Sequence, residues 1–305
     1  MPTCLACRHT DADHWAVGLD EEYFTTDDPF TYYQCQKCEA LFIDPVPRNQ
    51  LNIIYPANYY SFDEQVTGSF VFKIKDWLDQ RFFRKYISKL PQKKIHVLDV
   101  GGGTGKQLLS LLKVDDRITR TVIVDLNEDA GEVARQQGLE YFCGRFENYV
   151  SDEPFDVILM LNLIEHVDNP AELLAKAQSL LSPEGIVIVK TPNTDSLDAR
   201  LFRHRNWGGY HCPRHWVLFN ENNFKSIVQK TGLKIGFFKY TQGAPFWTTS
   251  ILYALGRRKW IRVSKERPVP KHPLYPVFNI FFACTDLLRG QVAKTSQMFA
   301  ILKQS

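Results

Sequence analysis

The residues best suited to bind a ligand form a glycine-rich turn. Four glycines follow directly on an apolar run, residues 95–100, and leucines then return at helical spacing. The glycines are Gly101, Gly102, Gly103 and Gly105. This pattern predicts a buried strand, a tight turn and the start of a helix. Because glycine lacks a Cβ atom, the backbone can approach a ligand closely, and the first helical turn directs free N–H groups toward it.

Two common nucleotide-binding motifs do not fit this turn. A phosphate-binding loop would need Ser or Thr after Gly105-Lys106, where Gln107 stands. A dinucleotide fingerprint has the spacing G-x-G-x-x-G, whereas the spacing here is G-x-G-x-G. Asp99 precedes the turn, and Asp125 ends the next predicted strand, where its carboxylate can accept hydrogen bonds from both hydroxyls of a ribose. The alternative is that Asp125 caps the helix that follows.

This stretch resembles the first motif of class I S-adenosylmethionine (SAM)-dependent methyltransferases, in which acids stand at these two places. The sequence FDVILMLNLIEHV at 155–167 is similar to the small-molecule branch of that family. The resemblance implies a SAM cofactor. It also implies the residues that contact SAM, which are Asp99, Gly101, Gly102, Gly103, Gly105, Asp125, Leu126, Arg145, Phe146, Leu161 and Asn162.

Residues 207–219 (WGGYHCPRHWVLF) hold side chains that can remove a proton. A neutral imidazole accepts a proton near pH 7, so we predict His215 as the base, His211 as the second candidate and Tyr210 as the orienting residue. Sugar C-methyltransferases with a zinc module show a similar Glu-His pair, with glutamate where Arg214 stands. The alternative is that His215 only fixes the loop by hydrogen bonding. His166 is interpreted as a hydrogen-bonded wall residue.

Two C-x-x-C pairs near the N-terminus predict a metal site. Cys4 and Cys7 form the first pair, and Cys35 and Cys38 form the second. Four thiolates at this spacing can bind Zn²⁺ tetrahedrally, which leaves no open position, so the zinc would be structural. The module is similar to the N-terminal zinc ribbon of sugar C-methyltransferases. The alternative is that these cysteines are reduced structural or redox-active thiols.

Strands alternate with helices over most of the chain, which predicts an α/β fold with helices on both faces of a parallel sheet. We expect a doubly wound, mostly parallel, seven-stranded sheet whose last strand, 296–303, is an antiparallel edge strand. A Tyr-rich loop at 55–62 and an amphipathic helix at 69–90 precede the sheet. The predicted units are a zinc ribbon at 1–48, a linker and helix at 49–92, and a methyltransferase domain at 93–305.

A helical insertion is predicted at 241–294, before the last strand. It is rich in aromatic and basic residues. We interpret it as a lid that shapes the acceptor pocket, and the alternatives are a homodimer face or a peripheral contact with a membrane surface. Its composition suits a sugar nucleotide, a polyketide or a lipid-linked acceptor equally well.

Composition limits the classes of function. The chain of 305 residues is 44% hydrophobic and carries 37 basic and 34 acidic residues, a formal net charge of +3. This balance gives no reason to expect a nucleic-acid partner. Neither a signal peptide nor a transmembrane segment is expected, so we predict a cytoplasmic location.

The predicted function is SAM-dependent methylation of an oxygen or carbon atom of a small molecule, such as a sugar, polysaccharide or secondary-metabolite precursor. One alternative is methylation of RNA or protein, although Asn162-Leu163-Ile164-Glu165 stands where such enzymes carry an Asn-Pro-Pro-Tyr-type tetrad. Another is a catalytically silent SAM-binding scaffold that docks through its zinc module.

Overall fold

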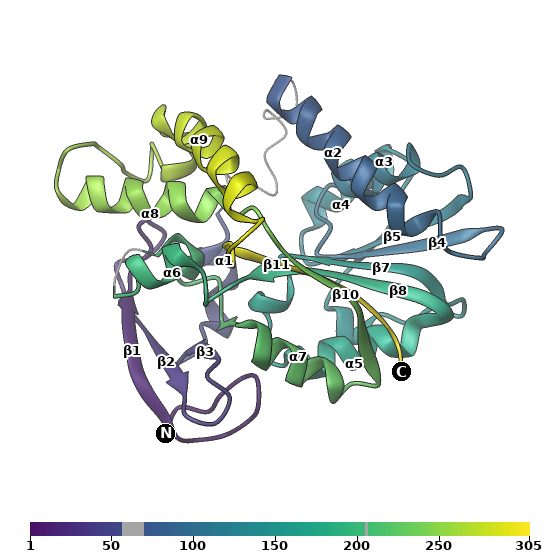
Figure 1. The fold of residues 1–305 in the computed structure, drawn as a ribbon, viewed down its shortest axis with the longest axis horizontal. Coiled ribbons are helices and arrows are strands. Elements are labelled where there is room, and N and C mark those ends of the chain that lie inside the picture. The colour runs from purple at the N-terminus through teal and green to yellow at the C-terminus, as the bar shows by residue number, and fades with distance from the viewer. Residues whose placement is uncertain (57–69, 205–206) are drawn as a thin grey trace.

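The computed structural model describes residues 1–56, 70–204 and 207–305. Two sheets organise these residues, one of seven strands and one of four. Figure 1 shows the larger sheet crossing the right half of the molecule and the smaller one, formed by the N-terminal strands, at the lower left. Residues 57–62 of the predicted Tyr-rich loop lie outside the described residues.

The seven-stranded sheet has the strand order β10-β11-β8-β7-β4-β5-β6. Chain order reverses beside β4, which pairs in parallel with both β5 and β7. The predicted doubly wound α/β fold is therefore confirmed. The strands are β4 (Ile95–Val100), β5 (Ile118–Asp125), β6 (Glu140–Cys143), β7 (Phe155–Leu161), β8 (Leu181–Pro192), β10 (Leu233–Thr241) and β11 (Gln297–Gln304).

The last strand corrects one prediction. β11 pairs antiparallel with β8 on one side and with β10 on the other, so it is not an edge strand. The first six residues of β11 are all buried, whereas most of β10 is partly exposed. The C-terminal strand enters the sheet beside β8, and β10 becomes the edge.

Helices cover both faces of this sheet. In Figure 1, α2 (Phe70–Ile87), α3 (Lys106–Leu112) and α4 (Glu128–Gln136) lie above it, and α5 (Pro170–Leu180) and α7 (Glu221–Gln229) lie below. Alternate residues of β4 enter the two apolar cores that result, as a strand buried on both faces requires. Ile95 and Val97 pack in the core under α2 and α3, and Leu98 and Val100 pack in the core with α5 and α7.

The helix predicted at 69–90 forms as α2, and Phe83 and Ile87 are buried in the core. Trp77 is exposed, at 55% of its surface, rather than packed beside the apolar stripe. The side chains of Phe70, Ile74 and Leu78 lie outside the described part of the chain.

The four-stranded sheet joins distant parts of the sequence. Its strands are β1 (Ala12–Gly18), β2 (Phe30–Cys35), β3 (Leu41–Ile43) and β9 (Val217–Leu218). β9 comes from the histidine-containing segment and pairs antiparallel with β3. Leu5 and Phe42 of the cysteine module share one apolar core with Leu174 and Trp216. Residues 1–48 therefore hold the histidine-containing segment in place instead of folding around a separate core.

The predicted helical insertion consists mainly of α8 (Ala244–Arg257) and α9 (Leu274–Arg289). These helices pack against each other, with Trp247 stacked on Phe282 at 5.2 Å between ring centroids. The Ser250 hydroxyl on α8 accepts a hydrogen bond from the backbone N–H of Gly208, at 2.7 Å, so α8 also supports the histidine-containing segment. Two short helices, α1 (Leu51–Ile54) and α6 (Leu197–Leu201), complete the fold. Within the described ranges, none of the helices has the length and hydropathy to cross a bilayer.

Candidate active site

The glycine turn joins β4 to α3 at the carboxyl edge of the sheet. Gly101, Gly103 and Gly105 have positive φ angles of 77°, 53° and 81°, which glycine adopts without strain. A Cβ atom on Gly102 would lie 2.7 Å from Asp99 Oδ2, so glycine is required by close approach there. The turn therefore packs directly against the buried Asp99 carboxyl group.

The two predicted aspartates flank this turn. Asp125 accepts backbone hydrogen bonds from Gly103 N at 2.9 Å and Leu126 N at 2.6 Å, which fixes its carboxylate beside the glycines. Asn127, not Asp125, caps α4, because its side chain accepts a hydrogen bond from Ala130 N. Burial, with a smaller contribution from the Asp125 charge, raises the pKa of Asp99 to about 8.

The remaining predicted SAM contacts lie at the ends of β5, β6 and β7. Leu126 is exposed beside Asp125, and Leu161 and Asn162 are half-buried at the end of β7. Asn162 has a φ of 56° and accepts a hydrogen bond from Gln297. Leu161 ends β7, and β7 pairs with β4, the strand that leads into the glycine turn. The other two predicted contacts have different surroundings. Arg145 pairs with exposed Glu147, and the side chain of Phe146 is buried in the core.

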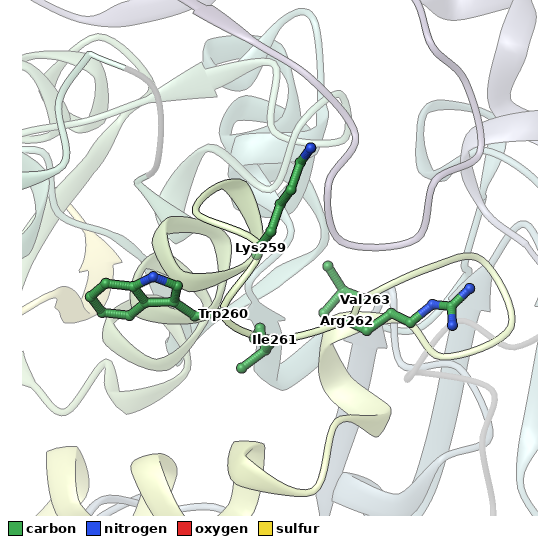
Figure 2. Close-up of a pocket in the computed structure, with 6 residues that line it drawn as sticks. Lys259, Trp260, Ile261, Arg262 and Val263 are labelled. Carbon is green, nitrogen blue, oxygen red and sulfur yellow. The ribbon is translucent and has the colours of Figure 1, made fainter.

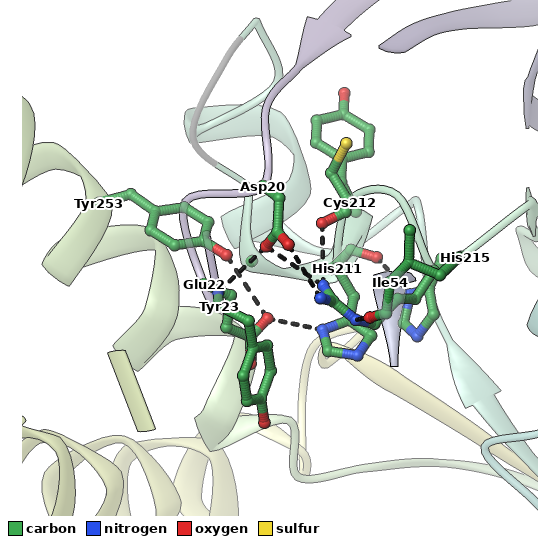
Figure 3. Close-up of polar contacts among 12 residues, drawn as sticks. Asp20, Glu22, Tyr23, Ile54, His211, Cys212, His215 and Tyr253 are labelled. Atoms are coloured by element: carbon green, nitrogen blue, oxygen red, sulfur yellow. Dashed lines mark hydrogen bonds and ion pairs between the residues drawn. The ribbon is translucent and has the colours of Figure 1, made fainter. Parts of the chain in front are cut away.

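Three histidines meet where the end of β7 contacts the segment 207–219. His215 lies 4.7 Å from His166 and 5.0 Å from His211, measured between ring centroids. Figure 3 shows His211 and His215 side by side. Burial, reinforced by the neighbouring histidines, lowers the pKa of His215 well below its usual range. Burial and the nearby His211 lower the pKa of His166 to about 3, so the rings of His166 and His215 are neutral at pH 7.

Glu165 lies beside these rings and is fully buried. Its Oε2 atom accepts a hydrogen bond from the Thr191 hydroxyl at 2.9 Å, and its Oε1 atom lies 3.9 Å from His215 Nε2. Burial raises the pKa of Glu165 to about 8. A carboxyl group and two neutral imidazoles thus share one buried site.

A buried ion pair holds the histidine-containing segment against the N-terminal module. Arg214 donates to both carboxylate oxygens of Asp20, at 3.2 and 2.9 Å, and to the Ile54 carbonyl at 2.6 Å. Both charged side chains have 0% exposure, and Figure 3 shows Asp20 and Ile54 in this network. Burial opposes ionisation of Asp20, but the Arg214 guanidinium outweighs it and holds the pKa of Asp20 below its usual range.

The other predicted catalytic residues have fixed partners. His211 Nδ1 lies 2.6 Å from a carboxylate oxygen of Glu22, which also accepts from the Tyr253 hydroxyl of α8. The Tyr210 hydroxyl donates to the Arg203 carbonyl at 2.6 Å and accepts from Trp15 Nε1. Tyr210 is therefore directed toward the N-terminal module rather than toward His215.

The four predicted zinc ligands come together. Cys4 Sγ lies 3.6 Å from Cys38 Sγ, and Cys7 Sγ lies 3.5 Å from Cys35 Sγ. All four sulfur atoms lie within 4.8 Å of one another. Sulfur atoms bound tetrahedrally to zinc at about 2.3 Å are roughly 3.8 Å apart, so this donor set fits the ion.

A separate hollow lies at the end of α8. Figure 2 shows it between Lys259, Trp260, Ile261, Arg262 and Val263. In Figure 1, α8 lies on the opposite side of the molecule from β4 and β5, so this hollow is remote from the glycine turn. The candidate active site is therefore the strand edge, not this hollow.

Comparisons with known proteins identify the family. A family model described as a methyltransferase domain matches residues 74–235, more than half of the chain. The chain belongs to this methyltransferase family. The match extends from α2 to β10 and includes the glycine turn and all three histidines.

Curated relatives of this methyltransferase include O-methyltransferases of ubiquinone biosynthesis. The protein from Caulobacter sp. (strain K31) is 32% identical over 118 residues, which cover 37% of this chain and 47% of that protein. The mitochondrial protein from Saccharomyces cerevisiae is 29% identical over 217 residues, covering 64% and 66%. The chain thus matches about half the length of its bacterial relatives.

Solved structures confirm the methyltransferase fold. Coclaurine N-methyltransferase, bound to N-methylheliamine and SAH, has a TM-score of 0.52 at 15% identity, with 82% of this chain and 80% of that chain covered. The cyclase SpnF has a TM-score of 0.51 at 12% identity, covering 79% and 85%. A cyclase with this fold illustrates that the fold does not by itself define the reaction.

The acidic partners of the histidine-containing segment were not predicted from the sequence. Asp20 and Glu22 lie between β1 and β2, where acids usually indicate an exposed loop. Arg214 is the available signal. Arg214 stands between Pro213 and His215, and a guanidinium that is buried there needs a buried carboxylate as its partner. The sequence does not indicate which carboxylate this is.

We predict that Asp20→Asn lowers the free energy of unfolding by about 3–5 kcal/mol at pH 7, because it leaves Arg214 buried without its counter-charge. Since the pKa of Asp20 lies below its ordinary value of 3.8 in the folded protein, the ion pair stabilises the fold fully above that pH. This contribution is lost as the pH falls below 3.8 through the lowered pKa. Denaturant unfolding at pH 7 and in acid measures both effects.

Asp13→Asn is the matched control, because Asp13 is exposed on β1. We expect it to change stability by less than about 0.5 kcal/mol. Equal stabilities of Asp20→Asn and the parent at pH 7 would contradict the role assigned to the ion pair.

Proposed function

We propose that this protein transfers the methyl group of SAM to a hydroxyl oxygen of a small molecule. The observation that carries the proposal is the Asp125 carboxylate, held beside the glycine turn by backbone N–H groups. An acid in that position can accept both ribose hydroxyls of SAM. The family match supports the cofactor, and the O-methyltransferase relatives favour oxygen over carbon as the acceptor.

The chain's own residues have three tasks in this reaction. Bound SAM would supply an electrophilic methyl group on a sulfonium. The glycine turn, Asp99 and Asp125 hold the cofactor, with Leu161 and Asn162 beside its methionine end. The hydroxyl proton leaves toward the histidine cluster as the oxygen–carbon bond forms and the carbon–sulfur bond breaks. Among the predicted bases, His215 supports this role best, because its Nδ1 is bound to Gly209 O and its Nε2 lies 3.9 Å from Glu165 Oε1, beyond hydrogen-bond distance.

The cysteine module has a structural role in this proposal. We propose that Cys4, Cys7, Cys35 and Cys38 bind one Zn²⁺, as their donor set permits. Through the pairing of β3 with β9, the module would fix the histidine-containing segment. The predicted cytoplasmic location stays a prediction, since the yeast relative is a mitochondrial protein.

We predict that Asp125→Ala weakens SAM binding roughly 100-fold, because two hydrogen bonds to a charged group contribute about 1.5 kcal/mol each. Isothermal titration calorimetry measures the Kd. Asp125→Asn tests the same point while it keeps an acceptor for Gly103 N. Asp129→Ala is the control, since Asp129 is exposed in the first turn of α4. Parental affinity in both Asp125 variants would remove the proposed ribose contact.

We predict that His215→Ala lowers kcat by about 100-fold or more and leaves the Kd for SAM within about 3-fold of the parent. Transfer of labelled methyl from SAM to a panel of phenols and sugars measures turnover. His215→Gln keeps a donor for the Gly209 carbonyl and guards against misfolding, and His14→Ala on β1 is the control. Full turnover in both His215 variants would exclude the histidine. Tight SAM binding with no acceptor would support the silent-scaffold alternative instead.

The insertion supports a proposal about the partner. One face of α9 exposes a stripe of apolar residues, and Phe281 and Leu288 are 58% and 74% exposed. The other exposed members are Leu274, Val277, Ile280 and Leu287. Between α8 and α9, residues 257–271 carry seven basic residues and one acidic residue, and Trp260 is 73% exposed.

We propose that this apolar and basic surface rests on an anionic lipid bilayer. The positive charge beside the stripe complements acidic headgroups, which a second copy of the same basic surface would not. This arrangement favours a lipid-linked acceptor over a sugar nucleotide.

We predict that the protein sediments with vesicles of phosphatidylglycerol and phosphatidylcholine, and that it binds phosphatidylcholine vesicles at least 10-fold more weakly. Phe281→Asp and Leu288→Asp should each reduce binding about 10-fold, because they put a charge into the apolar contact. Leu112→Asp, at an exposed position on α3, is the control. Analytical ultracentrifugation tests the homodimer alternative. A parent protein that is a dimer, and that either α9 variant dissociates, would contradict the proposed contact with a bilayer.

A further inference from the structure

Two groups of side chains in the described part of the chain have ligand atoms close enough to share a metal ion. The first is the cysteine site. The second consists of Glu165, His166 and His215, whose ligand atoms lie within 4.8 Å of one another. Glu165 and His166 follow the end of β7, and His215 comes from the segment that the N-terminal module holds. This group was not predicted from the sequence, because its members come from two distant segments.

Hydrogen bonds orient both imidazoles for metal binding. His215 Nδ1 donates to the Gly209 carbonyl at 2.7 Å. His166 Nδ1 lies 3.0 Å from the Arg214 carbonyl and 2.9 Å from the Tyr55 hydroxyl. A carbonyl can only accept, and a hydroxyl can accept as well as donate, so a proton on Nδ1 and a lone pair on Nε2 satisfy the contacts of both rings. Metal-binding histidines usually show this arrangement, with the second nitrogen bound to a backbone carbonyl or a carboxylate.

A hydrogen bond also orients the carboxyl group of Glu165, but only one of its two oxygen atoms has a hydrogen-bond partner among the described residues. Thr191 binds its Oε2 atom at 2.9 Å. Its Oε1 atom is buried without a hydrogen-bond partner among the described residues. The facing atom is His215 Nε2, at 3.9 Å, which is beyond hydrogen-bond distance. Glu165 Oε1 and His215 Nε2 therefore face each other without a hydrogen bond, and a cation between them would satisfy both.

We propose that Glu165, His166 and His215 bind a divalent transition-metal ion such as Zn²⁺ and present it to the acceptor hydroxyl. Two imidazole nitrogens and one carboxylate suit such an ion and leave coordination positions open. The segment that carries the site is next to the glycine turn, because a Cβ atom on Gly101 would lie 3.0 Å from Leu163 Cδ1. The site therefore lies at the same strand edge as the glycine turn.

This inference rests on the proposed function and assigns His215 to the metal instead of to a free base. A hydroxyl coordinated to the ion loses its proton to solvent more readily, which leaves an oxygen that attacks the methyl carbon. The oxygen–carbon bond forms, the carbon–sulfur bond breaks, and its electron pair goes to sulfur. No oxidant or reductant is needed.

Metal content of the full chain tests the proposal. We expect two equivalents of zinc per chain in the parent protein. Glu165→Gln and His215→Ala should each lose the zinc at the histidine site. The paired change Cys4→Ser with Cys7→Ser should lose the zinc at the cysteine site. Glu132→Gln, at an exposed position on α4, is the matched control and should keep both. Circular dichroism and thermal unfolding verify that each variant is folded.

Cobalt distinguishes the two sites by spectrum. Co²⁺ added to protein whose cysteine site holds zinc should give weak visible d–d bands without thiolate charge-transfer absorption, and Glu165→Gln should abolish them. One zinc per chain in the parent, removed by the cysteine change alone, together with the absence of these bands, would overturn the proposal.

SAM calorimetry on the same samples separates the two levels of inference. If the parent protein does not bind SAM, the proposed function is rejected. Undiminished methyl transfer in Glu165→Gln, with SAM bound normally, would reject the metal and leave the proposed function standing.

Discussion

The buried ion pair between Asp20 and Arg214 is the interaction on which the rest of the site depends. Two charges with 0% exposure stabilise the fold only because each satisfies the other and because Arg214 also donates to the Ile54 carbonyl. The pair ties together the N-terminal module, the end of α1 and the histidine-containing segment. Together with the pairing of β3 with β9, it fixes where His215 lies relative to β7.

The sheet supplies the other half of the site. Chain order reverses beside β4, so the helices that follow β4 and β7 pack on opposite faces of the sheet. The glycine turn and Asp125 lie on one side, and Glu165 and His166 lie on the other. A rigid sheet therefore positions the cofactor-facing residues, whereas the acceptor-facing residues depend on contacts from the N-terminal module and α8.

Local sequence patterns made much of the fold and of the glycine turn predictable. The apolar run 95–100 and its glycines define β4 and its turn, because burial on both faces and close backbone approach are properties of adjacent residues. Contacts between distant residues were not predictable. Nothing near Arg214 indicates Asp20, and the apolar sequence of β11 suits a central strand and an edge strand alike. For the same reason the sequence predicts Tyr210 as the residue that orients the base, although its hydroxyl binds Arg203 and Trp15.

The pairing of β3 with β9 has a consequence for biosynthesis. β3 leaves the ribosome early, but its partner is not made until the whole nucleotide-binding half has been translated. The nascent N-terminal module must therefore wait with an unpaired strand edge and an unmatched Asp20. Contacts of such long sequence separation form late and slowly, and an unpaired strand edge is prone to aggregation until they form.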